Sequence, residues 1–322
     1  MELNGLAKIS LLLVILLVSL SAYLRLAHSG IGCADWPECY GRIGESLSVS
    51  QPATSGIAYL RMVEHANISL AWATPLHRLV ASVLGLFIVF LVFFAMRRKK
   101  LRIISLALLG LTVFLAVLGI YSGSLHSPAI VMGNLVGGFS MLGLLGWMVF
   151  SPGSKGQHDT QDKAGTVKHM LIFAIIVLSM QIVLGGLTSA NFAATACQTL
   201  PDCHGSWLPT GALGIAFDLS RQHEVTPLGQ AIGGRERLAI HKTHRIGAVL
   251  TLAVILIAGL IALRAEARNR AAAIVLLALV TLEFSVGIAA ILTSLPIGLA
   301  VAHNWLAGLI LLALLKLTAL NR

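Results

Sequence analysis

The chain has 322 residues, of which 57% are hydrophobic and 11% are charged, and its formal net charge is +10. A mean hydropathy of +0.88 excludes an ordinary soluble domain and indicates a membrane protein with several spanning segments. The excess of Lys and Arg lies mainly in connections between apolar runs. The charge therefore reports membrane topology and gives no reason to expect nucleic acid as a partner.

Eight windows of about 20 apolar residues are each long enough to cross a bilayer. They predict an all-α polytopic membrane protein with eight transmembrane helices and with both termini on one side. We interpret the first window as an uncleaved anchor, because its apolar stretch is long and no small-residue cleavage site follows it. The windows are 7–27, 74–96, 102–122, 129–150, 169–189, 239–263, 271–292 and 298–318.

Basic connections set the expected orientation. The segments 97–102 and 264–270 are rich in Arg and Lys, and the polar linker 151–168 carries further lysines. The positive-inside rule places these connections, and with them both termini, in the cytoplasm. The long loops 28–72 and 190–237 contain all four cysteines. They then lie on the outer face of a bacterial inner membrane, where thiols can be oxidised.

The two outer loops share one motif. Cys33–Gly41 and Cys197–Gly205 both read Cys-x3-Pro-acid-Cys-x-Gly, and each is followed by a His-Arg pair that opens the next helix, His77-Arg78 or His244-Arg245. This agreement predicts two tandem four-helix repeats in the same orientation. The N-terminal half is 1–150, the cytoplasmic linker is 151–168 and the C-terminal half is 169–322.

The cysteines are spaced for two disulfides, Cys33–Cys39 and Cys197–Cys203, each closing a short loop that contains a proline. Zinc binding is the competing interpretation, although four-ligand zinc sites usually have the tighter Cys-x2-Cys spacing. A redox role for the first pair, by thiol exchange, also stays open.

Two histidines lie near the leading ends of apolar runs, His244 in 238–257 and His303 in 299–315. Ionisable residues at membrane depth normally face the bundle interior and have a function. Two imidazoles presented by facing helices would suit a six-coordinate haem iron. The alternative is that each histidine forms a hydrogen bond with a neighbouring helix.

The first half is chemically different. It offers His77, but the stretch Val131–Gly138 has Asn134 where the repeat leads us to expect a second histidine, and Asn is a poor iron ligand. We therefore expect a closed two-histidine site in the C-terminal half and an open site in the N-terminal half. This asymmetry fits one cofactor for electron transfer and another that is acted upon.

Other polar residues near these histidines are candidates for contacts with haem propionates. Arg78 and Arg245 are placed to neutralise carboxylates, or alternatively extend toward lipid headgroups. His241 lies one helical turn before His244, where it would either contact a propionate or stabilise the loop.

Together these motifs resemble the haem A synthase family over essentially the whole chain. The resemblance implies an eight-helix inner-membrane protein that oxidises the C8 methyl group of haem O to the formyl group of haem A, for use by a haem-copper oxidase. It also implies a b-type haem held by His244 and His303, with the substrate haem near His77. The residues that carry it are Ser21–Leu26, Cys33–Gly41, His77-Arg78, Gly185–Asn191, Cys197–Gly205, Ile240–Arg245 and Ala302–Asn304.

The expected partners are haem O, haem A, the lipid bilayer and the farnesyltransferase that makes haem O. The sequence does not identify the electron donor, and assembly of identical chains is left open.

Two positions depart from the family pattern. Family members typically have Glu-x-x-His-Arg and a second histidine, where this chain has Thr74 before His77 and Asn134 in the fourth helix. A threonine hydroxyl can position water but cannot serve as a carboxylate base. The leading hypothesis is an active synthase. The alternative is a catalytically degenerate haem b protein, an electron carrier or an assembly factor. The repeat symmetry alone would also suit a transporter.

Overall fold

The structure is a computed structural model that describes residues 3–28, 72–96, 98–121, 127–151, 161–209, 212–220 and 234–321. The predicted disulfide Cys33–Cys39 lies outside these residues. The described ranges contain helices and turns and no strand, and eight of the helices are long and apolar enough to cross a membrane. The predicted all-α class and the eight spans are confirmed.

The long helices are α1 (Leu3–His28), α3 (Ala73–Ala95), α4 (Lys99–Tyr121), α5 (Pro128–Phe150), α6 (Gln161–Ala190), α8 (Arg235–Ala265), α9 (Arg270–Leu292) and α10 (Ile297–Leu320). A one-turn helix, α7 (Leu213–Ala216), lies in the second outer loop, and a short 3-10 helix, η1 (Ala267–Asn269), precedes α9.

Several helices begin before their predicted apolar windows, and α6 and α8 are two of them. α6 begins at Gln161, inside the stretch that we expected to be linker, and α8 begins at Arg235. The windows detect only the part of a helix that matches the hydrocarbon core, whereas the helical backbone continues through the polar residues on either side. The early turns of α8 thereby place charged side chains against the outer loop.

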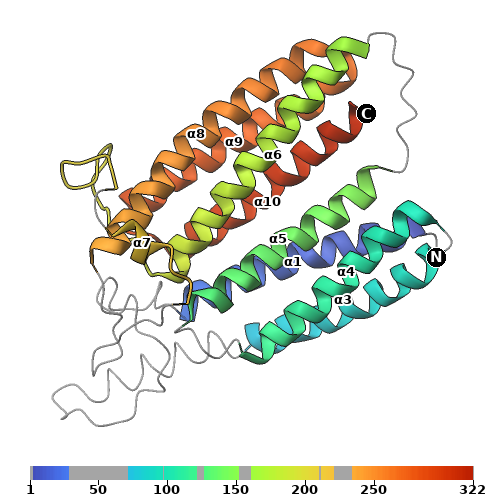
Figure 1. The fold of residues 1–322 in the computed structure, drawn as a ribbon, viewed down its shortest axis with the longest axis horizontal. Coiled ribbons are helices and arrows are strands. Elements are labelled where there is room, and N and C mark those ends of the chain that lie inside the picture. Colours follow the sequence, from blue (N-terminus) through green and yellow to red (C-terminus); the bar gives the residue numbers. More distant parts are fainter. Residues whose placement is uncertain are drawn as a thin grey trace.

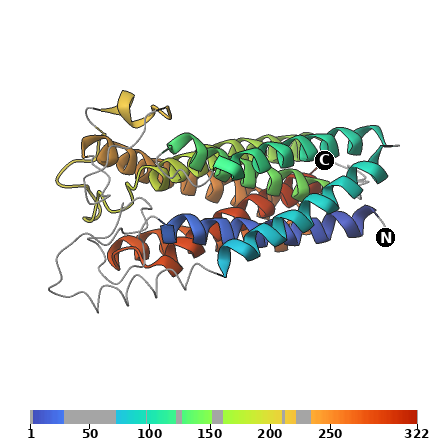
Figure 2. The ribbon, with the colours of Figure 1, turned by 90° about the horizontal axis from the view of Figure 1, so that it is seen from below.

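The helices form two groups that lie side by side (Figure 1). One contains α1, α3, α4 and α5, and the other contains α6, α8, α9 and α10. α5 packs on α6 and α10, and α1 packs on α10, so one apolar core runs through both groups. A tandem repeat would give such an arrangement, but the repeat and its domain boundaries stay predictions. Both termini lie at one end of the bundle (Figures 1 and 2).

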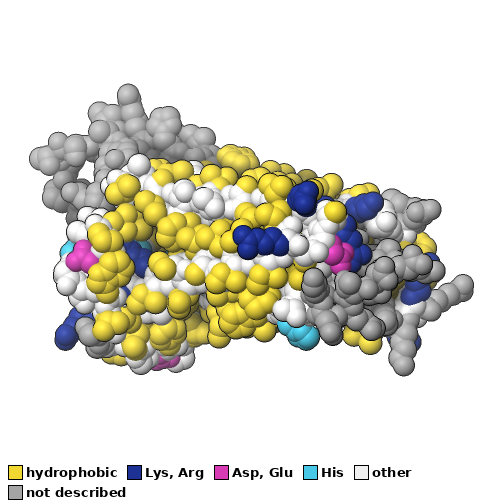
Figure 3. Space-filling model, turned by 90° about the horizontal axis from the view of Figure 1, so that it is seen from above, with side chains coloured by type: hydrophobic (Ala, Val, Ile, Leu, Met, Phe, Trp, Pro, Cys, Tyr) yellow, Lys and Arg dark blue, Asp and Glu magenta, His cyan; other side chains and the backbone are white. Residues whose placement is uncertain are grey.

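Hydrophobic side chains spread over the middle of the face drawn in Figure 3, and Lys and Arg are few there. Several of the largest are well exposed, including Phe93, Ile120 and Met180. An apolar surface of this extent would be a liability in water, but it is the surface that lipid tails require.

Candidate functional site

A cavity of about 430 Å³ lies within the second helix group. α6, α8, α9 and α10 provide most of its wall, and side chains of α1 and α5 close one side. Leu200, Pro201 and Trp207 of the second outer loop also line it, so it lies toward the end of the bundle that carries that loop. Its volume lies in the range of roughly 300–1,000 Å³ that is common for ligand pockets.

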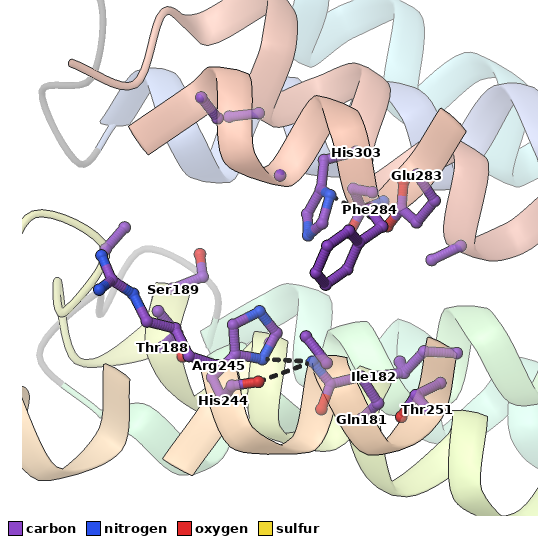
Figure 4. A pocket seen from close by; sticks show the side chains of 18 of the residues that line it. Gln181, Ile182, Thr188, Ser189, His244, Arg245, Thr251, Glu283, Phe284 and His303 are labelled. Carbon is purple, nitrogen blue, oxygen red and sulfur yellow. Dashed lines mark hydrogen bonds and ion pairs between the residues drawn. The ribbon is translucent and has the colours of Figure 1, made fainter. Parts of the chain in front are cut away.

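His244 and His303 point toward one another across this cavity, from α8 and α10 (Figure 4). Their ring centroids are 6.4 Å apart and the ring planes are nearly perpendicular, at 85°. Both side chains are half-buried, and most of the lining around them is apolar. The structure thus brings together the two histidines that the sequence pointed to.

Each imidazole has a polar neighbour close to its Nδ1 atom, and we predicted neither of these residues. The Nδ1 atom of His303 lies 3.0 Å from Oε1 of Glu283 on α9. The Nε2 atom of Gln181 on α6 lies 3.0 Å from Nδ1 of His244 and donates a second 3.0 Å bond to the carbonyl oxygen of His244. These contacts leave the Nε2 atom of each ring directed to the cavity.

A glycine lies one helical turn after each of these partners. A Cβ atom at Gly185 would come within 3.2 Å of Cε1 of His244, and one at Gly287 within 3.2 Å of Cε1 of His303. Residues four apart share a helix face. Gln181 with Gly185, and Glu283 with Gly287, therefore form matching surfaces against which the two rings lie.

The geometry suits a metal ion between the rings. Two metal–nitrogen bonds of about 2.0 Å each span ~4 Å, and the rest of the centroid separation is close to two ring radii. A metal at Nε2 requires the ring proton on Nδ1. Oε1 of Glu283 lies within reach of such a proton on His303. The Gln181 amide donates to His244, and it would present its oxygen to Nδ1 only after a half-turn that breaks its bond to the carbonyl oxygen of His244. A haem iron held between His244 and His303 fits these residues.

Arg245 fastens the disulfide loop to α8. Its Nη1 atom donates to the carbonyl oxygens of Thr199 (2.7 Å) and Asp202 (3.2 Å), and its Nη2 atom donates to that of Cys197. The loop is closed by the Cys197–Cys203 disulfide, with the Cα atoms 5.2 Å apart, as predicted. The guanidinium that we expected to meet a propionate thus binds backbone carbonyls.

His241 is buried and lines the cavity on the His244 side, one turn nearer to the start of α8. Its Nδ1 atom is buried without a hydrogen-bond partner among the described residues. This position is compatible with a polar ligand group at that end of the cavity.

In the first helix group, His77 lies on the same stripe of α3 as the buried residues Ala73, Val80 and Leu84. Thr74 lies one turn before it and is half-buried, whereas Arg78 is exposed. The stripe directs His77 into the first group. Nothing in the described residues tests its expected role as an iron ligand.

Asn134 on α5 also faces the first group. Cβ atoms at Gly133 and Gly137 would point to α4, and one at Gly138 would point to α1. Successive helical residues differ by about 100°, so Asn134 projects between these two directions. When α5 and α10 are aligned on the prolines at their starts, Leu135 is the residue that corresponds to His303. Leu135, however, packs against Gly186 of α6 and does not face the first group. Asn134 is thus the residue that faces the predicted open site.

Comparison with known proteins shows the family to which the chain belongs. The model of a family described as Cytochrome oxidase assembly protein, COX15-CtaA, matches residues 5–315. The chain belongs to the COX15-CtaA family. It is 32% identical to the Heme A synthase of Shewanella oneidensis, over 98% of this chain and 96% of that protein. It is 27% identical to the Heme A synthase of Neorickettsia sennetsu, over 94% of each, and 26% identical to that of Shouchella clausii, over 66% of this chain and 68% of that protein.

Sequence reasoning missed three residues of this COX15-CtaA cavity, namely Gln181, Glu283 and Arg25. Glu283 and Arg25 carried a usable signal, because a charged residue inside an apolar span is rarely without a partner or a function. Gln181 is neutral, and only the packing of α6 on α8 reveals its contact with His244.

Proposed function

We propose that the protein is a haem A synthase, which oxidises the C8 methyl group of haem O to the formyl group of haem A. The observation that carries this proposal is the pair of facing imidazoles in an apolar cavity, in a chain whose relatives over nearly its whole length are named Heme A synthase. The similarity over the whole chain favours a synthase over a degenerate haem carrier.

The C-terminal cavity would hold a b-type haem through His244 and His303. When bound, this group supplies electron-transfer chemistry. The protein supplies the rest: Gln181 and Glu283 fix the orientation of the rings, and the apolar wall keeps water out.

Substrate haem O would bind in the first helix group, near His77. His77 and Asn134 both face the interior of that group. A single strong ligand there leaves the second face of the substrate iron open. Arg78, which lies at the outer end of α3, is placed to meet a substrate carboxylate outside the apolar core.

We place the chain in the bacterial inner membrane as a multi-pass protein, with both termini in the cytoplasm and the cysteine loops outside. The common end of the two termini and the basic connections support this orientation. The expected upstream partner is the farnesyltransferase that makes haem O.

The function is tested by producing the chain in cells that contain haem O and lack their own haem A synthase, then extracting and identifying the haems. Accumulation of haem A is the expected result. If the protein is present in the membrane and haem O remains unchanged, the synthase proposal is wrong.

The ligand assignment has a separate spectroscopic test. The purified wild type should show a low-spin b-type spectrum, and His303→Ala or His244→Ala should abolish it, because either change removes one of two axial bonds. Survival of that spectrum in both variants would show that other residues hold the haem.

A further inference from the structure

A cation from the first helix group also lines the C-terminal cavity. Arg25 lies near the end of α1, and its Nη2 atom donates a 3.3 Å hydrogen bond to Oδ1 of Asn304, the residue after His303. The Nε atom of Arg25 is buried and has no hydrogen-bond partner among the described residues. Within the part of the chain that the structure describes, Asn304 is the only polar partner of this guanidinium.

Most N–H donors of the Arg25 guanidinium therefore have no acceptor among the described residues. It carries a full positive charge and five N–H donors, and an isolated charge at membrane depth is costly. The amide oxygen of Asn304 accepts one hydrogen bond but supplies no countercharge. The one acidic residue among the described residues that line the cavity is Glu283, and its carboxylate faces Nδ1 of His303.

The other arginine of the cavity is already engaged. Arg245 donates to three backbone carbonyls of the disulfide loop through its two Nη atoms. Arg25 has no such set of acceptors among the described residues. Other buried polar atoms of the lining also have no hydrogen-bond partner among the described residues, and two of them are Oγ of Ser189 and Nδ1 of His241. All three residues lie near the ends of their helices that adjoin the outer loop.

We propose that Arg25 binds a carboxylate of the molecule held in the C-terminal cavity, so that α1 of the first group helps to hold a ligand of the second. The ligand class is a flat apolar molecule with carboxylate side chains at one edge. This inference rests on the proposed function, in which that molecule is haem and the carboxylate is a propionate. The bound haem then connects the two helix groups through Arg25 and His303.

The test compares two probes on full-length protein produced in a haem-deficient host, namely ferric protohaem and its dimethyl ester, in which both carboxylates are masked. Wild type should bind protohaem more tightly than the ester. Arg25→Gln should bind protohaem roughly 10- to 100-fold more weakly and should lose most of the preference for the free acid. Arg264→Gln, at the opposite end of α8, is the matched control and should keep the preference.

Equal affinity of the wild type for both probes, or an unchanged preference in Arg25→Gln, overturns the role of Arg25. If Arg25→Gln fails to accumulate, Arg25→Lys serves in its place. The lysine cation has one nitrogen on a different stem, so this variant should reduce the preference for protohaem over the ester. An unchanged preference again overturns the proposal. A wild type that forms no low-spin complex with protohaem would instead contradict the haem site itself, and with it the proposed function.

Discussion

Glu283 and Gln181 occupy equivalent places beside the two imidazoles but differ in charge. Glu283 offers His303 an anionic acceptor, whereas Gln181 offers His244 a neutral amide. An anionic acceptor on Nδ1 makes the ring a stronger donor to a metal and favours the higher oxidation state. The two axial bonds are therefore expected to be unequal, with the His303 side setting the reduction potential.

This inequality predicts opposite effects of two isosteric changes. Glu283→Gln should raise the midpoint potential of the bound haem, and Gln181→Glu should lower it. A charged hydrogen bond exceeds a neutral one by about 1 kcal/mol, which for a one-electron couple is on the order of 40 mV. Redox titration followed by absorbance measures both shifts. Shifts of the same sign in the two variants would contradict the assigned contacts.

At the residue scale, the sequence indicated the two histidines that face one cavity but not the residues that contact them. His244 and His303 were recognisable because polar residues at helix ends stand out in apolar runs. We expected Arg245 to contact a propionate or a lipid headgroup, and we did not predict its hydrogen bonds to the loop carbonyls. No sequence pattern shows which backbone oxygens a folded loop will present.

At the scale of helices, α6 and α9 provide the surfaces against which the imidazole rings of His244 and His303 pack. Gly185 and Gly287 have no Cβ atom, and this allows α8 and α10 to bring their histidines against the backbone of the neighbouring helix. Small residues commonly permit such close helix approach in membranes. The spacing of the two rings thus depends on helix packing as well as on the rings themselves.

Gly287→Ala tests this dependence. The added methyl group would lie 3.2 Å from Cε1 of His303, so the ring or α10 must move by a few tenths of an ångström. Overpacking typically costs about 1–3 kcal/mol, which should appear as weaker haem retention and a perturbed low-spin spectrum. Gly110→Ala on α4 is the control, because its methyl group would meet no described atom within 4 Å. Equal behaviour of the two variants would remove Gly287 from the account of the site.

The length of the apolar runs predicted where the eight spanning helices lie, but it did not predict the residues at which they begin and end. All eight spans were expected, yet α6 starts inside the predicted linker and α8 starts before its apolar window. Polar residues extend a helix when its first turns find partners, as Arg237 of α8 does by donating to the carbonyl oxygen of Phe192 in the outer loop. Such partners are known only after the chain has folded.

At the scale of the whole molecule, the two helix groups have different chemical content. The second group has two facing histidines with fixed rings, and the first has His77 and Asn134 facing its interior. Thr74 lies one turn before His77, at the position where the resemblance to the family led us to expect a glutamate. If the groups act as separate sites, a change at Thr74 should alter turnover without disturbing the haem of the second group.

Thr74→Glu is therefore expected to raise haem A formation in cells that contain haem O. A carboxylate one turn before His77 lies on the same side of α3 and would assist proton removal, and such assistance is typically worth about 10²–10⁴-fold. The low-spin spectrum should stay as in wild type, because His244 and His303 belong to other helices. Thr74→Gln is the matched control, because glutamine has nearly the size of glutamate but no basic carboxylate. This variant should not raise haem A formation. If neither the wild type nor Thr74→Glu, alone or combined with Asn134→His, forms haem A, the first group has no synthase activity. The chain would then be a haem-binding member of its family.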